Sequence, residues 1–119
     1  MKNILVIEDN EDNMYMMKFI LEQSNLNVIM ATTGMGGYEK ALAYKPDLIL
    51  MDIQLPDVNG MEVTKMIRNS EIADSIPIIA VSSYAMTGDK QKALQAGCTA
   101  YIEKPIDPES IMQKILKYL

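Results

Sequence analysis

The sequence alternates between short apolar runs and longer stretches in which apolar residues recur with helical spacing. Five such runs occur along the chain: Asn3–Ile7, Asn27–Ala31, Leu48–Met51, Pro77–Ser82 and Ala100–Ile102. Strands that are apolar throughout, each joined to the next by a helix, are typical of a parallel sheet covered by helices on both faces. We therefore predict an α/β fold, a doubly wound parallel sheet in which five strands alternate with helices.

The chain has 119 residues, the usual size of one domain. We expect one domain over residues 1–119 and no second, output domain. No apolar run approaches the roughly 20 residues that a membrane span needs. Met1 leads directly into the first apolar run, so we expect no signal peptide. Cys98 is the single cysteine and cannot form an internal disulfide, which favours a cytoplasmic protein with Cys98 as a buried packing residue.

Charge and the absence of histidine exclude several classes of function. The net charge is −5 and the pI is near 4.6, which argues against binding to nucleic acid through its phosphates. Without histidine the chain cannot carry out His-based acid–base catalysis, and nearly all zinc sites are excluded. A bound metal would have oxygen ligands, which points to Mg²⁺ or Ca²⁺.

Polar residues follow the apolar runs at the point where each predicted strand ends. Functional groups in open parallel sheets gather beyond these carboxyl ends. The residues found there include Glu8 and Asp9 after the first run, Asp52 after the third, Ser82 in the fourth and Lys104 after the fifth. Three carboxylates brought close together repel one another unless they share a proton or bind a cation. Mg²⁺ fits best, because it takes one or two carboxylates and keeps positions for phosphate oxygens.

This set of residues has the chemistry of a phosphoryl acceptor. The Asp52 carboxylate would be the nucleophile, Lys104 and Mg²⁺ would offset charge on the phosphoryl oxygens, and the Ser82 hydroxyl would donate to one of them. A small Mg²⁺-dependent phosphatase of the haloacid-dehalogenase type uses a similar aspartate. That type needs a second Asp two residues later as the general acid, and Gln54 occupies this position.

Two nucleotide-binding interpretations are weaker. The glycines of Gly34–Gly37 follow the second run, whereas a dinucleotide fingerprint follows the first strand and a P-loop requires a G-K-[ST] motif. We expect this segment simply to open a helix. A flavodoxin-like electron carrier would need a phosphate-binding loop after the first strand, where Glu8 and Asp9 would repel the FMN phosphate.

The sequence resembles the receiver domains of two-component response regulators over its whole length. The resembling motifs are "VIEDN", "LILMDIQLPDVNG", "IPIIAVSS" and "AYIEKPID". The resemblance implies strand order 2-1-3-4-5, with the five helices distributed over both faces of the sheet.

The resemblance also implies roles for individual residues. Asp52 would accept a phosphoryl group from a phosphohistidine on a partner histidine kinase or histidine phosphotransferase. Mg²⁺, or Mn²⁺ in its place, would be held by Glu8, Asp9, Asp52 and the backbone carbonyl of Gln54. The acidic pair is Glu-Asp rather than the commoner Asp-Asp, so Glu8 would contact the metal through water. Lys104 corresponds to the lysine of the family.

Four further residues match positions that respond to the phosphoryl group in the family. Ser82 would be the switch hydroxyl and Tyr101 the aromatic side chain whose rotamer follows it. Gln54 and Tyr84 would flank the route of the attacking water and tune the rate of dephosphorylation. A cis peptide bond in Lys104–Pro105 is expected from the resemblance, since the chemistry of X-Pro bonds alone gives a frequency of only about 5%.

The first helix suggests where a partner could dock. A core-facing stripe of Asn13, Met16, Met17, Ile20, Leu21 and Ser24 would leave Met14, Tyr15 and Phe19 on other faces. Met and aromatic side chains on an exposed face suit the docking of a partner helix. The alternative is that they pack beneath neighbouring loops.

"EDNEDNM" and "AVSSYAMTGD" resemble stand-alone receivers of the DivK type most closely. This favours a phosphorelay intermediate or kinase modulator that is not itself an enzyme, and whose output is a contact with a downstream protein. The face formed by the fourth helix, fifth strand and fifth helix would carry that output, with Ala93, Leu94 and Ala96 anchoring the fourth helix. Receivers attached to hybrid histidine kinases share part of the pattern and remain an alternative.

Overall fold

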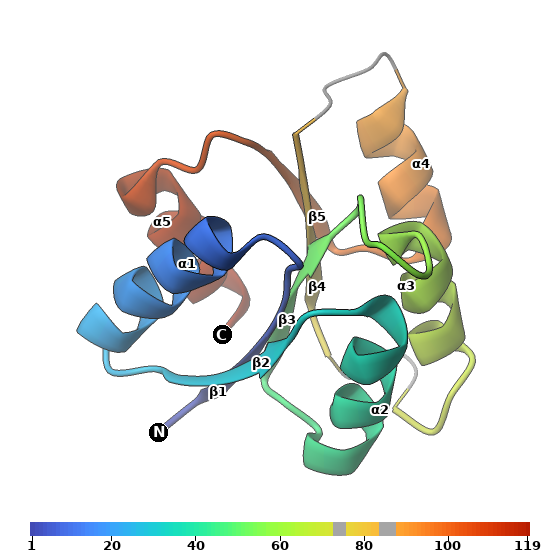
Figure 1. Cartoon of the computed structure of the whole chain (residues 1–119), viewed down its shortest axis with the longest axis horizontal. Helices are drawn as coiled ribbons and strands as arrows, with labels where there is room; N and C mark the ends of the chain where they lie inside the picture. The colour runs from blue at the N-terminus through green and yellow to red at the C-terminus, as the bar shows by residue number, and fades with distance from the viewer. Residues whose placement is uncertain (73–75, 84–87) are drawn as a thin grey trace.

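The structure, a computed structural model, describes residues 1–72, 76–83 and 88–119. Five strands form one sheet: β1 (Asn3–Ile7), β2 (Asn27–Ala31), β3 (Leu48–Asp52), β4 (Ile78–Ser82) and β5 (Ala100–Glu103). All neighbouring pairs are parallel and their order is β2-β1-β3-β4-β5, as predicted (Figure 1). β3 is buried along its whole length, including Asp52. The sheet therefore carries a carboxylate into a protected position at the end of its central strand.

Five helices cover both faces of the sheet, which confirms the predicted fold class. They are α1 (Glu11–Gln23), α2 (Gly34–Tyr44), α3 (Gly60–Arg68), α4 (Asp89–Ala96) and α5 (Pro108–Tyr118). Figure 1 shows α1 and α5 on one face and α2, α3 and α4 on the other. Each face has its own hydrophobic core, because successive residues of a strand point to opposite sides.

Local sequence explains where the helices begin. Asn10, Thr33 and Asp107 are the N-caps of α1, α2 and α5, and each side chain accepts a backbone N–H three residues later. Gly34–Gly37 opens α2, as predicted. A β-carbon on Gly60 would collide with the backbone carbonyl of Asp52, so glycine lets α3 begin directly against the end of β3.

The inward face of α1 differs from the prediction. The buried residues are Met14, Met17 and Leu21, which are spaced i, i+3 and i+7. Asn13 is only partly buried and Ser24 is exposed. Turning the helix to bury Met14 removes apolar surface from water and leaves polar Ser24 hydrated. The predicted stripe was therefore wrong at Ser24 and left out Met14, whereas Asn13 is partly buried, as Met16 and Ile20 are.

In the part of the chain that the structure describes, every helix is too short or too polar to cross a bilayer. Cys98 is buried, as predicted, and its sulfur lies 3.6 Å from the Thr64 hydroxyl oxygen.

Candidate functional site

Three acidic side chains meet at the carboxyl ends of β1 and β3. Ile7 pairs with Met51 in the sheet, so the residues that follow them, Glu8 and Asp52, emerge side by side. Carboxylate oxygens of Glu8, Asp9 and Asp52 lie within 4.8 Å of one another. Glu8 is 1% exposed and Asp52 is 4% exposed, whereas Asp9 faces solvent. This convergence confirms the prediction made from the residues that end the apolar runs.

Lys104, which directly follows the edge strand β5, completes the cluster. Its ammonium nitrogen lies 2.6 Å from Glu8 Oε1 and 3.5 Å from Asp52 Oδ2. The backbone N–H of Lys104 donates to the carbonyl of Ser82 at 2.8 Å, which fixes the chain as it leaves β5. The Lys104–Pro105 bond is cis, in agreement with the resemblance. Lys104 therefore pairs more closely with Glu8 than with Asp52, a preference that the sequence did not indicate.

The two buried acids have opposite pKa shifts. Burial, together with the adjacent Glu8 carboxylate, raises the pKa of Asp52 to about 7 against the opposing effect of Lys104. Burial alone would raise the pKa of Glu8 as well, but its contacts with Asp52 and Lys104 outweigh burial and lower it. Without a further cation the site thus favours an ionised Glu8 paired with Lys104, while Asp52 keeps its proton to a higher pH than an ordinary aspartate does.

The donor set fits a hard divalent cation. Glu8 Oε2 is buried and has no hydrogen-bond partner within residues 1–72, 76–83 and 88–119. A buried carboxylate oxygen without a partner is costly, and a bound cation would satisfy it. Carboxylate oxygens are the ligands that Mg²⁺ prefers. Glu8, Asp9 and Asp52 could hold such an ion, while the part assigned to the Gln54 backbone carbonyl stays a prediction.

Ser82 and Gln54 lie on the other side of Asp52. Ser82 is the last residue of β4 and is 1% exposed. The Gln54 side-chain nitrogen donates to Ser82 Oγ at 3.2 Å, and the Gln54 backbone N–H donates to Asp52 Oδ1, also at 3.2 Å. The structure brings Ser82 and Gln54 together as neighbours of the acidic cluster. Tyr84 lies outside the described residues.

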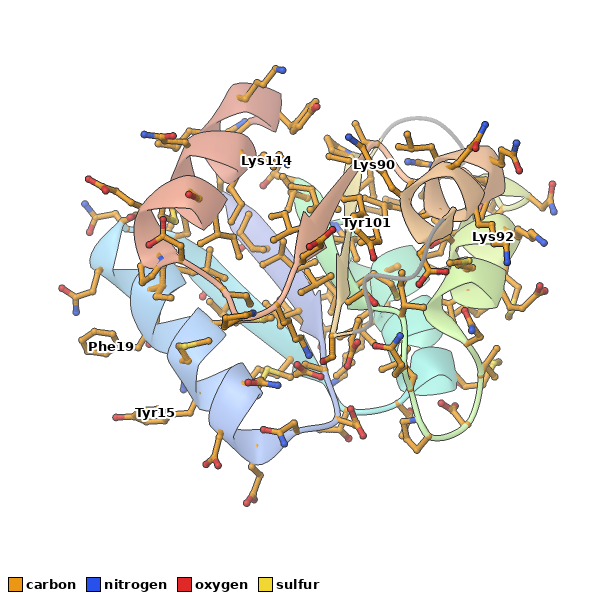
Figure 2. The ribbon with its side chains drawn as sticks, turned by 90° about the horizontal axis from the view of Figure 1, so that it is seen from above. Tyr15, Phe19, Lys90, Lys92, Tyr101 and Lys114 are labelled. Atoms are coloured by element: carbon orange, nitrogen blue, oxygen red, sulfur yellow. The ribbon has the colours of Figure 1, made fainter. Side chains whose placement is uncertain are left out.

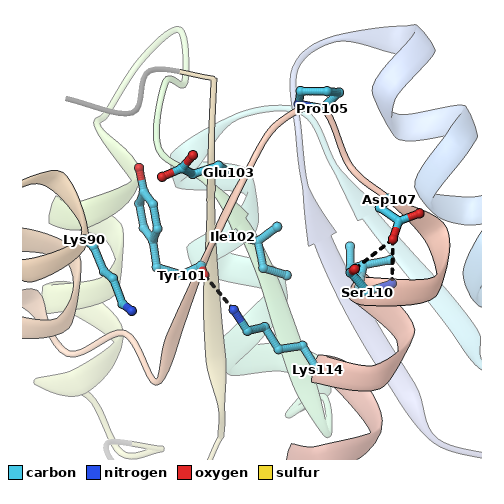
Figure 3. Close-up of a pocket in the computed structure, with 9 residues that line it drawn as sticks. Lys90, Tyr101, Ile102, Glu103, Pro105, Asp107, Ser110 and Lys114 are labelled. Atoms are coloured by element: carbon cyan, nitrogen blue, oxygen red, sulfur yellow. Dashed lines mark hydrogen bonds between the residues drawn. The ribbon is translucent and has the colours of Figure 1, made fainter.

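Tyr101 is buried on the α4 side of β5 and belongs to the same core cluster as Ala93 of α4. Its backbone carbonyl accepts a hydrogen bond of 3.1 Å from the Lys114 ammonium of α5. Figure 3 shows its ring beside Glu103 and facing Lys90 of α4. A cavity of about 430 Å³ is lined here by residues of α4, β5 and α5. Tyr101 therefore links the sheet to the surface formed by these three elements.

The three predicted docking residues of α1 separate into two groups. Tyr15 is 73% exposed and Phe19 is 55% exposed, and both project into solvent from α1 (Figure 2). Met14 is only 7% exposed and packs in the core with Met17 and Leu21. Its assignment to an exposed docking face was wrong, because α1 turns Met14 toward the sheet.

Asp57 is a positioning residue that the sequence analysis missed. Its two carboxylate oxygens accept the backbone N–H groups of Gly34 and Met35 at 2.7 and 3.0 Å. This bidentate contact ties the loop after Asp52 to the N-terminus of α2, where the helix dipole favours a negative charge. The contact joins residues 22 and 23 positions apart, so no local spacing signals it.

Comparisons with known proteins show the family of the chain. The model of the response regulator receiver domain matches residues 4–116. The polar-differentiation response regulator DivK of Brucella ovis is 43% identical over 118 residues, covering 99% of this chain and 96% of that protein.

Two solved structures share both fold and sequence with the chain. One is the receiver domain of a sensor histidine kinase from Pseudomonas aeruginosa PAO1, which has a magnesium ion coordinated in its active-site cleft. It is 31% identical with a TM-score of 0.91, covering 98% of this chain and 96% of that one. The other is a CheY-like receiver domain protein from Methanospirillum hungatei JF-1, 32% identical with a TM-score of 0.91, covering 98% and 92% of the two chains.

The parallel sheet, the acidic cluster at its carboxyl edge and these matches lead to one assignment. The chain belongs to the response regulator receiver domain family of two-component signalling.

Proposed function

We propose that Asp52 accepts a phosphoryl group from a phosphohistidine on a partner histidine kinase or histidine phosphotransferase. The observation that carries this proposal is the convergence of Glu8, Asp9 and Asp52 within 4.8 Å, with the Lys104 ammonium 3.5 Å from Asp52. The Asp52 carboxylate is placed to react, and the charged groups of Glu8, Asp9 and Lys104 surround it. The aspartyl phosphate would then alter contacts with a downstream protein in a phosphorelay.

In the transfer, an Asp52 carboxylate oxygen forms a bond to phosphorus while the bond from phosphorus to the histidine nitrogen breaks. The electron pair of that bond stays on the departing imidazole. Asp52 must be ionised to react, and Lys104 favours its ionised form. Lys104 would also donate to an oxygen of the transferred group. When bound by Glu8, Asp9, Asp52 and the Gln54 backbone carbonyl, Mg²⁺ or Mn²⁺ supplies charge that offsets the carboxylates and the phosphoryl oxygens.

The decisive experiment is incubation with acetyl phosphate and Mg²⁺, followed by intact mass measurement. We expect one labile phosphoryl adduct, its loss in Asp52→Asn and its loss when EDTA removes the metal. Asp12→Asn is a matched control, because Asp12 is an exposed carboxylate in the first turn of α1. An adduct that persists in Asp52→Asn would overturn the proposal, and steady hydrolysis of phosphate esters would favour the phosphatase alternative.

Signal output would pass through Ser82 and Tyr101 to the surface formed by α4, β5 and α5. Lys90 of α4 and Lys114 of α5 lie on this surface (Figure 2). Ala93 and Ala96 are buried in α4, whereas Leu94, predicted as an anchor, is exposed because it faces away from the sheet. A helix held by two small side chains shifts at low energetic cost.

This output can be measured by amide hydrogen exchange with and without the phosphoryl mimic beryllofluoride. We expect changed protection between Gly88 and Lys104, since α4 and β5 lie within this range. Unchanged protection across the segment would contradict an output surface at α4, β5 and α5.

Docking of the phosphohistidine partner would use the exposed side chains of Tyr15 and Phe19. Tyr15→Asp and Phe19→Asp should slow transfer from a phosphohistidine donor and leave phosphorylation by acetyl phosphate unchanged, because acetyl phosphate needs no protein contact. Tyr44→Asp is the matched control, since Tyr44 is an exposed aromatic residue on α2. Equal transfer rates for all three variants would exclude α1 as the docking site.

We also propose what type of receiver carries out this reaction and which residues control loss of the phosphoryl group. A stand-alone receiver of the DivK type is supported by a relative that matches along nearly its whole length, and its location in the cytoplasm stays a prediction. Such a protein would not act on separate substrates, although it would assist its own phosphorylation and slow dephosphorylation. Gln54 and Tyr84 would set the rate at which water removes the phosphoryl group.

A further inference from the structure

Gln54 contacts both Asp52, the proposed phosphoryl acceptor, and Ser82, the proposed switch residue. Its backbone N–H donates to Asp52 Oδ1, and its side-chain nitrogen donates to the Ser82 hydroxyl oxygen at 3.2 Å. Its side-chain oxygen accepts the backbone N–H of Ser83 at 3.5 Å. One amide therefore bridges the loop after β3 and the end of β4.

The orientation of this amide follows from hydrogen-bond chemistry. The backbone N–H of Ser83 can only donate, so it must face the carbonyl oxygen of the Gln54 side chain. The amide nitrogen of Gln54 then faces Ser82, whose hydroxyl oxygen accepts. Ser82 is almost completely buried, so this hydrogen bond is partly shielded from water and is stronger than a fully exposed one.

We propose that Gln54 is a positioning residue that holds Ser82 in its unphosphorylated position and opposes its movement toward the phosphoryl group. The proposal rests on the proposed function, since it assumes that Asp52 carries a phosphoryl group and that Ser82 responds to it. When Ser82 turns to donate to a phosphoryl oxygen, its oxygen leaves the Gln54 amide. Gln54 thereby stabilises the unphosphorylated position of Ser82 and contributes to the free-energy difference between the two positions of this side chain.

The size of the effect follows from the bond that is lost. One hydrogen bond of ordinary net strength changes a two-state equilibrium by about two- to tenfold. Removing the Gln54 amide should therefore shift the protein toward the switched state by this factor. A ligand that binds the switched state should then bind more tightly by a similar factor.

Gln54→Met is the variant that isolates this bond. Methionine has nearly the same length as glutamine but no amide, and the backbone N–H that contacts Asp52 is retained. The measurement is a titration with beryllofluoride in the presence of Mg²⁺, followed by the amide NMR signals of β4 and β5. We expect the affinity for the mimic to rise by about two- to tenfold relative to the wild type.

A double-mutant cycle with Ser82 separates positioning of the hydroxyl from any direct contact of Gln54 with the phosphoryl group. In a Ser82→Ala background the hydroxyl is absent, so Gln54→Met should leave the affinity for beryllofluoride unchanged. In a Ser82→Thr background the hydroxyl returns, and the effect of Gln54→Met should return with it. A purely structural role of Gln54 would not depend on this hydroxyl.

The outcomes are distinct. Unchanged or weakened binding in Gln54→Met, or a gain that persists in Ser82→Ala, would overturn the positioning role while leaving the proposed function intact. If the wild type itself failed to bind beryllofluoride with Mg²⁺, the proposed function would fail and the positioning role with it. An increase in the affinity for beryllofluoride that requires the hydroxyl at position 82 supports both the positioning role of Gln54 and the proposed function.

Discussion

Arg68 and Asp52 lie at opposite ends of the same sheet, and their surroundings differ in how buried polar groups are satisfied. At the amino ends of β4 and β5, the Arg68 guanidinium donates to the carbonyls of Gly97 and Ile76 at 2.9 and 2.7 Å. At the carboxyl ends of β1 and β3, Asp52 and Glu8 are buried together near the ammonium group of Lys104. One end satisfies its polar groups, and the other concentrates like charge.

This difference indicates which end serves stability and which serves chemistry. The Arg68 guanidinium donates to the neutral oxygens of Gly97, Ile76 and Thr99, and these hydrogen bonds join the end of α3 to the starts of β4 and β5. Asp52 and Glu8 repel each other when both are ionised, and such local conflict is expected where a site must bind a cation and a phosphoryl group. Substitutions at the two ends should therefore change stability in opposite directions.

The largest effect is expected at Asp52. Asp52→Asn removes a carboxyl group whose pKa is raised to about 7 by burial and by Glu8. The shift from the ordinary value of 3.8 predicts that this variant is more stable than the metal-free wild type by roughly 2–4 kcal/mol at neutral pH, at 1.36 kcal/mol per pKa unit. Denaturant unfolding of both proteins in EDTA measures this, and a less stable variant would contradict the comparison.

The difference in stability between Asp52→Asn and the metal-free wild type should increase as the pH rises. The raised pKa means that folded Asp52 retains its proton above pH 3.8 while the unfolded chain has lost it. Stability of the metal-free wild type should therefore fall, relative to Asp52→Asn, as the pH rises from about 4 to about 7. Unfolding curves of both proteins across this range test the sign, and a constant difference would be inconsistent with the raised pKa.

The opposite effect is expected at Arg68. Arg68→Met keeps the apolar stem but leaves the carbonyls of Gly97 and Ile76 without these donors, which should destabilise the protein by about 1.5–3 kcal/mol. Lys65→Met is the control one turn earlier, because Lys65 forms an exposed pair with Glu62 at 3.3 Å. The control should change stability by less than about 0.5 kcal/mol, and equal losses in both variants would show that the guanidinium contacts contribute nothing.

Mg²⁺ should stabilise the acidic site at the carboxyl ends of β1 and β3, and so make it more similar in stability to the Arg68 end of the sheet. A cation that binds only the folded site stabilises it by about 1.4 kcal/mol at ten times its dissociation constant. Thermal unfolding should show this gain in the wild type and in Arg68→Met, and a smaller gain in Asp52→Asn. An equal increase in all three proteins would place the bound ion elsewhere.

The smallest effect is expected at Asp57, which lies at the carboxyl edge but is well satisfied. Its bonds to the backbone N–H groups of Met35 and Gly34 lower its pKa. The resulting stabilisation is present above the ordinary value of 3.8 and is lost as the pH falls through the lowered folded value. Asp57→Asn should therefore lower the melting temperature slightly at pH 7, and the difference from the wild type should shrink in acid. A difference that grew in acid would contradict this role.

Much of the fold and of the site could be predicted from the sequence. The apolar runs located all five strands, although β3 and β5 extend one residue further, to Asp52 and Glu103, and β4 begins one residue later, at Ile78. The resemblance supplied the strand order, which the apolar pattern alone does not encode. Glu8, Asp9, Asp52 and Lys104 were predicted as neighbours because the carboxyl ends of parallel strands share one edge.

The wrong predictions concern which face of a helix points toward the core, not where the helices and strands lie in the sequence. The periodicity of α1 admitted more than one inward face, so Met14 was assigned to the surface although it lies in the core. Leu94 was misassigned for a similar reason, since α4 is short and its few apolar residues do not define a face. Neither error changed the predicted order of helices and strands.

The sequence by itself determined the alternation of strands and helices and the residue types at the carboxyl edge, since both depend on local patterns of apolar and polar residues. Only the tertiary structure decided that Lys104 lies closer to Glu8 than to Asp52, that Gln54 bonds to Ser82 and that Asp57 binds the start of α2. These contacts join residues that lie 22 to 96 positions apart in the sequence. Their distances depend on how strands and helices pack in three dimensions, which no spacing along the chain specifies.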